Sequence, residues 1–310
     1  MKNLKIIVAA ACIVAAFFIY LFIPNRISLK GDYYVAQESN GVTRAMLSIQ
    51  YWDKWMPYKK IEGHTFIFDK GSLEVLASFV SSARTNYLLY GVYAHVNFLA
   101  VSAGKDSTLI RYDAEVYNAY FSPIKRIQNY QTAQKINTQL QIILNAAGKS
   151  FSTHKGIYGF DIKETQAKDS LLITTEKVFA DTPSTAQVYD LIHQLEIHIK
   201  TNKGNIQGDP MVNMTKTADN KINTVVAFPI AQTISETALI RIKKIAFRNV
   251  LTAAVNGNQM KSNWALEAML LYQNDKSMNA TFMPFVVYNN NRLVEKDPNK
   301  WVSSIYYPIQ

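Results

Sequence analysis

Apolar residues form one uninterrupted run near the N-terminus and, further along the chain, a series of alternating and helically spaced patterns. The run covers residues 6–23, contains neither a charged residue nor a helix breaker, and is followed by Pro24. At about 1.5 Å per residue such a helix is about 27 Å long, close to the roughly 30 Å of a bilayer hydrocarbon core. The pattern predicts a membrane-spanning helix within residues 1–25.

Two other interpretations of the run fit less well. A cleaved signal peptide usually ends its apolar stretch in small residues, whereas this run ends in bulky side chains such as Phe22 and Ile23. A lipoprotein signal would place Cys12 after a longer apolar stretch than residues 6–11. We therefore expect an uncleaved anchor that binds the chain to a membrane.

The flanking charges set the expected orientation of this anchor. Lys2 and Lys5 precede the run, and Arg26 and Lys30 follow it. The positive-inside rule therefore favours a cytoplasmic N-terminus only slightly. We expect a single-pass protein of the cell membrane whose body lies outside the cytoplasmic membrane.

The first region after the anchor, residues 26–165, combines strand patterns with one long helix. Alternating apolar and polar positions predict antiparallel strands over residues 64–68, 73–80, 85–92 and 108–116. Apolar residues then recur at helical spacing over residues 124–147, and Gly148 predicts the end of that helix.

These features resemble the START-like family of polyketide cyclases and lipid-transport proteins (SRPBCC, the helix-grip fold). The resemblance rests on residues 52–57 (WDKWMP) after an early short helix, on the strand series, on the long helix and on residues 157–160 (IYGF). It implies a curved antiparallel sheet that grips a helix around an apolar cavity able to hold a lipid. A filled core would give the same sequence pattern, and both interpretations stay open.

The second region, residues 168–310, repeats one order of elements. Residues 170–178 alternate as a strand, Thr182 or Ser184 can cap the next helix, and the helix covers residues 186–201. The remaining elements are strands over 211–217 and 222–229, strands over 238–247 and 252–255, a helix over 259–272, and strands over 282–288 and 304–309. The region therefore predicts two successive strand–helix–strand–strand units within an α+β protein.

This region is similar to the GyrI-like small-molecule-binding domain, which also serves as the effector-binding domain of AraC- and MerR-type transcription activators. The similarity rests on residues 185–195, 208–211, 225–230, 284–288 and 297–308. It implies a duplicated fold with a central groove lined by aromatic rings. Members often place a glutamate on a groove strand, where it binds cations or, in a few hydrolytic members, takes part in catalysis.

This chain departs from the family at that glutamate, because the expected strand position holds Val286 or Val287. Glu267 is the candidate replacement, on a helix face shared with Trp264, if that face lines the groove; an ordinary exposed glutamate is the alternative. The predicted ligand-binding residues are Trp264, Glu267, Phe285, Tyr288, Trp301 and Tyr306.

Composition narrows the function classes. The chain has 310 residues, of which 48% are hydrophobic and 18% charged, as expected for two domains with their own cores. Cys12 is the single cysteine, so the body has no disulfide and no thiol nucleophile. The net charge of +10 becomes +8 without Lys2 and Lys5. The sequence has no dense basic run and no nucleic-acid-binding motif, so we expect no nucleic-acid partner.

Searches for catalytic and metal motifs find little. His193 and His198 are five residues apart, so they do not share a helix face as zinc ligands at i and i+4 would. Asp113 and Glu115 share a strand face, a spacing that is common by chance. The chain has no nucleophile elbow, phosphate-binding loop or dinucleotide fingerprint.

The sequence therefore predicts a membrane-anchored, non-catalytic protein that binds a hydrophobic or aromatic small molecule and uses neither cofactor nor metal. One alternative is a hydrolase that uses Glu267 and a tyrosine on a small electrophile. The other is a structural envelope protein with filled cavities and no ligand.

Overall fold

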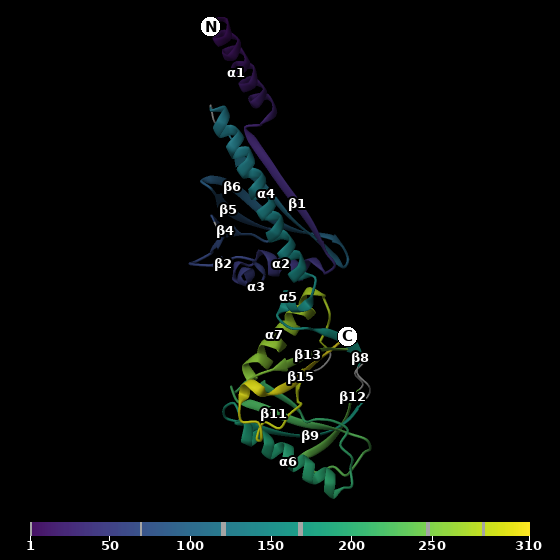
Figure 1. The fold of residues 1–310 in the computed structure, drawn as a ribbon. Helices are drawn as coiled ribbons and strands as arrows, with labels where there is room; N and C mark the ends of the chain where they lie inside the picture. Colours follow the sequence, from purple (N-terminus) through teal and green to yellow (C-terminus); the bar gives the residue numbers. More distant parts are fainter. Residues whose placement is uncertain (1, 69, 119–121, 167–169, 246–248, 281–282) are drawn as a thin grey trace. The chain divides into compact units, whose positions relative to one another are not determined.

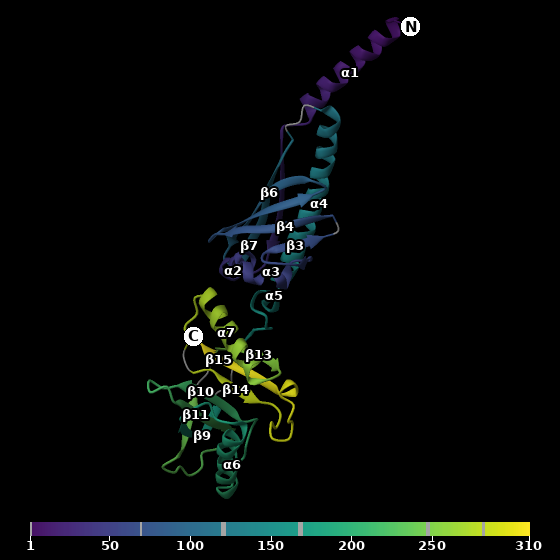
Figure 2. The ribbon, with the colours of Figure 1, turned by 90° about the vertical axis from the view of Figure 1, so that its left-hand side faces the viewer.

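The chain forms two compact units, each with an antiparallel sheet and covering helices (Figures 1 and 2). The structure, a computed structural model, describes residues 2–68, 70–118, 122–166, 170–245, 249–280 and 283–310. Unit 1 comprises Met1–Ile157 and unit 2 comprises Tyr158–Gln310. The α+β class with antiparallel sheets is confirmed. Residues 158–165, assigned above to the first region, belong to unit 2.

The N-terminal helix α1 spans Lys2–Phe22. Within the described residues, no helix has both the length and the apolar character needed to cross a membrane. The membrane-spanning helix predicted above is therefore unsupported. The location outside the cytoplasmic membrane depended on that helix and stays a prediction.

Unit 1 wraps a seven-stranded sheet around one long helix, α4 (Pro123–Phe151). The strand order is β1-β7-β6-β5-β4-β3-β2. The strands are β1 (Arg26–Val35), β2 (Lys59–Lys60), β3 (Thr65–Phe68), β4 (Gly71–Ser78), β5 (Ser82–Leu89), β6 (Val92–Gly104) and β7 (Ser107–Tyr117). The short helices are α2 (Ser39–Leu47), η1 (Ile49–Tyr51), α3 (Trp52–Trp55) and α5 (His154–Tyr158). The four strands predicted for this region are present, and α2 lies where the early short helix before residues 52–57 was expected. Strands β1, β2 and β6 were not predicted.

Helix α4 begins at a side-chain cap and continues past its predicted end. The Ser122 hydroxyl accepts a hydrogen bond from the backbone N–H of Lys125, and Pro123 occupies the first turn, where its missing N–H costs nothing. Gly148 lies inside the helix, so the stop predicted there was wrong. A Cβ at Gly148 would lie 2.3 Å from the Tyr33 ring, which indicates that this glycine allows α4 to approach β1 closely.

Aromatic rings fill the space between α4 and the sheet. The Trp52 ring lies 4.9 Å from that of Trp55 and 5.7 Å from that of Phe98, and Trp55 contacts Phe151 of α4 at 5.7 Å. These side chains are buried. The observed packing favours a filled core over an apolar cavity in unit 1, and the START-like assignment itself stays a prediction.

Unit 2 is built on an eight-stranded sheet whose order repeats about its centre. The order is β12-β9-β11-β10-β14-β15-β13-β8. Its strands are β8 (Lys163–Gln166), β9 (Ser170–Phe179), β10 (Met211–Lys216), β11 (Ile222–Ile230), β12 (Ile240–Ile245), β13 (Asn249–Asn256), β14 (Phe285–Tyr288) and β15 (Val302–Ile309). The helices are α6 (Thr185–Thr201), α7 (Gln259–Asp275) and η2 (Pro298–Lys300).

The two halves of this sheet each follow the predicted order of strand, helix, strand and strand. The first is β9-α6-β10-β11 and the second is β13-α7-β14-β15, and they join where β10 pairs with β14. Ser184 caps α6 and forms a capping box with Gln187. Residues 246–247 and 282 of two predicted strands lie outside the described residues, as do 167 and 168 near the predicted domain boundary.

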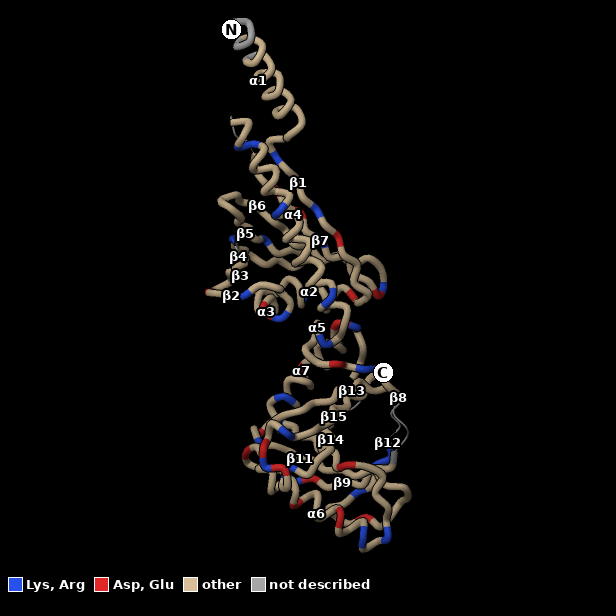
Figure 3. The backbone as a smooth tube through the Cα atoms, in the orientation of Figure 1, with Lys and Arg blue, Asp and Glu red and all other residues tan. Residues whose placement is uncertain are grey.

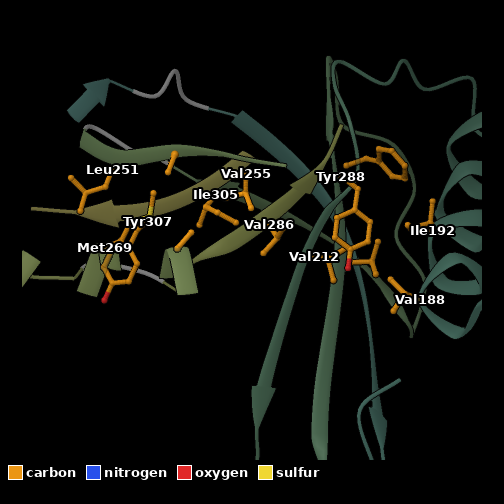
Figure 4. Close-up of a cluster of buried hydrophobic side chains, with 14 of the residues drawn as sticks. Val188, Ile192, Val212, Leu251, Val255, Met269, Val286, Tyr288, Ile305 and Tyr307 are labelled. Atoms are coloured by element: carbon orange, nitrogen blue, oxygen red, sulfur yellow. The ribbon is translucent and has the colours of Figure 1, made fainter. Parts of the chain in front are cut away.

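Helices α6 and α7 pack on the sheet, α6 against β9 and β11 and α7 against β13 and β15. Figure 4 shows the core beneath them, where Val188 and Ile192 of α6 lie beside Tyr288 and Val212. Successive strand residues point to opposite faces, so the neighbours of these core residues along the strands point away from the helices. The core therefore leaves the other face of the sheet available for a site.

Two buried tyrosines of unit 1 provide a matched test of its core. Among the described residues the Tyr87 hydroxyl has no hydrogen-bond partner, and burial raises its pKa. The Tyr112 hydroxyl donates to Oδ1 of Asn137 at 2.8 Å. An unpaired buried polar group costs free energy, whereas a paired one contributes about 1 kcal/mol.

Tyr87→Phe should leave the free energy of unfolding unchanged or raise it, and Tyr112→Phe should lower it by about 1 kcal/mol, as measured by urea denaturation. Equal losses of unfolding free energy in both variants would contradict the finding that the Tyr87 hydroxyl is unpaired and the Tyr112 hydroxyl is paired.

Candidate functional site

An open cavity of about 680 Å³ lies on the sheet of unit 2. Its walls include Met211 of β10, Phe285 of β14 and Tyr306 of β15. The residues next to them along the strands, Val212, Val286 and Ile305, belong to the core beneath the helices. Because strand side chains alternate, the cavity lies mainly on the face of the sheet opposite α6 and α7.

Two stacked rings form the aromatic part of the cavity. Phe285 and Tyr306 are directly paired across β14 and β15, and their rings stack at 5.2 Å between centroids with 4° between planes. They pack against a small apolar cluster of Leu172, Ala227 and Val250. Cross-strand aromatic pairs of this kind stabilise a sheet while presenting a flat apolar surface. This part of the cavity suits a flat apolar group.

A hydrogen-bonded chain of three polar side chains forms another part of the lining. The Ser304 hydroxyl donates to Oδ1 of Asn289 at 2.8 Å, and the Asn289 amide donates to Oδ2 of Asp209 at 3.0 Å. All three residues line the cavity. Neither of these two hydrogen bonds uses Oδ1 of Asp209, so this oxygen is a further acceptor. The arrangement can accept a hydrogen bond from a ligand held against the rings.

The β8 side of the lining carries an ion pair. Nζ of Lys163 lies 3.3 Å from Oδ2 of Asp161, and both side chains are 67% exposed. Surface pairs of this kind contribute little to stability. Asp161 and Lys163 are therefore available to a polar part of a ligand.

The predicted ligand-binding residues fall into three places. Phe285 and Tyr306 line the cavity. Trp264 and Glu267 do not: both are exposed on α7, which buries Ala268 and Met269 against the other face of the sheet. The helix face that carries Trp264 and Glu267 is therefore directed toward solvent, as in the alternative of an ordinary exposed glutamate.

Tyr288 and Trp301, the remaining two, enclose a buried arginine. The guanidinium carbon of Arg292 lies 3.4 Å from the centre of the Tyr288 ring and 4.6 Å from that of Trp301. Burial lowers the pKa of Arg292 and raises the pKa of the Tyr288 hydroxyl. These rings therefore stabilise a buried cation of the protein itself.

Hydrogen bonds connect Arg292 to three neighbouring elements. Its Nη1 donates to Oε1 of Gln259 at 3.1 Å and its Nη2 to Oγ of Ser303 at 2.7 Å. Its backbone N–H donates to the Tyr189 hydroxyl at 2.7 Å. The arginine thus connects the β14–β15 loop to α6, α7 and β15. The same loop begins with Asn289, so Arg292 supports the polar part of the cavity.

Sequence reasoning missed Asp209, Asn289, Ser304 and Arg292. Asp209 lies within residues 208–211, which contribute to the family similarity, but no spacing along the chain connects it with Asn289. The pairing of β10 with β14 brings the two together. The available signal was the polar stretch 289–292, which follows a buried strand without a break.

No protein-family model matches the sequence, and no curated protein matches it. Among solved structures, the chain is similar to the EcmrR C-terminal domain at 12% identity, covering 49% of this chain and 98% of that one with a TM-score of 0.43. It is also similar to SAV2435 bound to tetraphenylphosphonium, at 12% identity, with 48% and 93% coverage and a TM-score of 0.33. A norcoclaurine synthase mutant from Thalictrum matches at 15% identity, with 40% and 92% coverage and a TM-score of 0.32. At these scores the similarities carry no functional argument.

Arg292→Lys should destabilise unit 2. A lysine ammonium cannot stack between two rings while it donates to both Gln259 and Ser303, because it lacks the planar fork of a guanidinium. We expect the free energy of unfolding to fall by about 2 kcal/mol, measured by urea denaturation. The exposed Arg241 provides a matched control, and Arg241→Lys should stay within about 0.5 kcal/mol of the parent. Similar effects in both variants would contradict the role given to Arg292.

Proposed function

We propose that unit 2 binds a small hydrophobic or aromatic molecule in the cavity on its sheet. The observation that carries this proposal is the stacked pair of Phe285 and Tyr306 in a cavity of about 680 Å³. Ligand sites typically measure about 300–1,000 Å³ and combine apolar walls with a few placed polar groups. Both conditions are met by residues of unit 2 alone.

The polar groups narrow the class of ligand. Asp209, Asn289 and Ser304 form one polar part, and the Asp209 carboxylate is acceptor-only when ionised. A flat aromatic molecule that carries a hydrogen-bond donor, such as a protonated amine, complements both parts of the lining. This carboxylate comes from the segment before β10 and therefore from a different position than the family glutamate.

The hydrolase alternative required Glu267 in the groove. Glu267 is exposed on α7 and is absent from the described cavity lining. A general base must reach the proton that it removes, so the geometry does not favour Glu267 in that role. The ligand-free envelope protein is the remaining alternative, and the binding experiment below tests it.

Tyr306→Ala should weaken binding of a flat aromatic cation such as rhodamine 6G. Removal of one of the two stacked rings takes away a flat contact surface, and the dissociation constant should rise roughly tenfold or more. Fluorescence anisotropy of the dye with the full chain measures the constant. Ala254 of β13 also lines the cavity, and Ala254→Trp, which adds bulk to the lining, should weaken binding as well.

Trp264→Ala is the matched control, since this aromatic residue of unit 2 lies outside the cavity lining. Its dissociation constant should stay within about twofold of the parent. Equal losses in Tyr306→Ala and Trp264→Ala, or no binding of any flat aromatic probe, would contradict the proposal. Native mass spectrometry of the purified chain provides a second measurement, because a copurified small molecule would appear as added mass.

Asp209→Asn should separate recognition of charge from recognition of shape. The amide keeps the size of the carboxylate but loses its charge, so the affinity for rhodamine 6G should fall about twofold to fivefold, as expected for an exposed ion pair worth up to about 1 kcal/mol. The affinity for an uncharged aromatic probe, such as N-phenyl-1-naphthylamine, should not change. Parallel losses for both probes would contradict a charge-specific role for Asp209.

A further inference from the structure

Helix α1 presents bulky apolar side chains to its surroundings. Phe17, Leu21 and Phe22 are 65%, 62% and 73% exposed. Large contiguous apolar surfaces on a protein mark sites that another molecule covers. The chemistry of the segments next to α1 indicates what that molecule is.

The end of α1 is held against unit 1 by hydrogen bonds and by a stacked cation. Nε of the buried Arg126 donates to the backbone carbonyl of Ile23 at 2.9 Å, and its guanidinium lies 4.6 Å from the centre of the Tyr20 ring. The backbone N–H of Asn118 donates to the carbonyl of Asn25 at 2.8 Å. The C-terminal end of α1 is therefore fixed beside the end of β7 and the first turn of α4.

Exposed side chains next to this junction form what we call the collar: Arg26, Tyr117, Ile124 and Lys125. Ile124 is 69% exposed and Tyr117 is 53% exposed. The guanidinium of Arg26 lies 5.0 Å from the centre of the Tyr117 ring. The collar thus places aromatic and aliphatic groups beside two exposed cations.

The segments that carry α1 and the collar contain few acidic residues. Residues 1–31 and 116–160, which contain α1, the collar and all of α4, include no aspartate or glutamate. Figure 3 shows Lys and Arg segments at the junction of α1 with β1 and α4, while the acidic segments of unit 1 lie farther along the sheet. The exposed Glu115 lies just outside these segments, on β7 opposite Ser28 and two residues from Tyr117. Arg26, Lys125 and Arg126 outnumber this single carboxylate, so this end of the unit carries net positive charge.

We propose that this end of unit 1 docks on an anionic lipid surface. The apolar side chains of α1 contact the acyl chains, and Arg26 and Lys125 of the collar contact the lipid phosphates. Tyrosine and arginine are suited to this depth because each combines an apolar body with a polar tip. Each basic residue near an anionic surface contributes to binding until salt screens it. This surface is separate from the cavity of unit 2 and does not depend on its ligand.

Flotation of the full chain with lipid vesicles tests the proposal. Binding to vesicles of phosphatidylcholine with phosphatidylglycerol should be stronger than binding to phosphatidylcholine alone, and the difference should disappear at high salt. Neutralisation of the collar in the double variant Arg26→Gln/Lys125→Gln should weaken partitioning to the anionic vesicles roughly thirtyfold. Its partitioning to phosphatidylcholine vesicles should not change.

The double variant Lys243→Gln/Lys244→Gln is the matched control, because it removes the same charge from exposed positions of β12 in unit 2. Its partitioning should equal that of the parent, and circular dichroism should show both double variants folded. Binding that ignores phosphatidylglycerol and salt would overturn the proposal, since α1 would then act through its apolar side chains alone. Equal losses in both double variants, or no vesicle binding at all, would also overturn it.

Discussion

The pairing of β10 with β14 is the contact on which the candidate site depends. In the part of the chain that the structure describes, its ladder consists of two residue pairs, Met211 with Val287 and Val212 with Val286. Side-chain and backbone bonds extend it, since Nδ2 of Asn213 donates to the carbonyl of Pro284 at 2.6 Å and the Tyr288 N–H donates to the carbonyl of Pro210 at 3.0 Å. This short seam joins the two halves into one sheet and brings Asp209 beside Asn289.

The register of the β10–β14 pairing decides which side chains point into the core and which point into the cavity. Val212 and Val286 point to the helices, while Met211 and Val287 point to the cavity. A shift of one residue would exchange the two sets, because side chains alternate along a strand. Arg292 supports this arrangement from the loop after β14, where Tyr288 and Trp301 stack on it. The same strand register therefore determines both which residues form the core and which residues line the cavity.

Aromatic residues serve different ends in the two units. In unit 1, Trp52 and Trp55 fill the space between the sheet and α4, and Gly148 lets that helix approach Tyr33. In unit 2, Phe285 and Tyr306 stack on the face that the helices leave uncovered. The difference is explained by which face a helix covers: α4 covers the sheet face on which the tryptophans lie, whereas α6 and α7 cover only the opposite face of their sheet.

Local periodicity predicted most strands and helices, because alternation and helical spacing are properties of neighbouring residues. It also predicted the repeated element order of unit 2, and it left the cap of α6 open between Thr182 and Ser184, of which the structure has Ser184. It failed at Gly148, where a glycine that permits close packing has the same local appearance as one that ends a helix.

The sequence by itself determined the elements, the absence of a disulfide and the acid-free segments around α1, since all of these follow from residue identities and local order. Only the tertiary structure decided which aromatic residues meet a cavity. Tyr288 and Tyr306 are both strand tyrosines, yet one stacks on Arg292 and the other on Phe285. Only the tertiary structure, likewise, directed Trp264 and Glu267 toward solvent and joined Asp209 to Asn289. These outcomes depend on strand pairing between distant segments and on the face that each helix covers, and neither is encoded in the spacing of neighbouring residues.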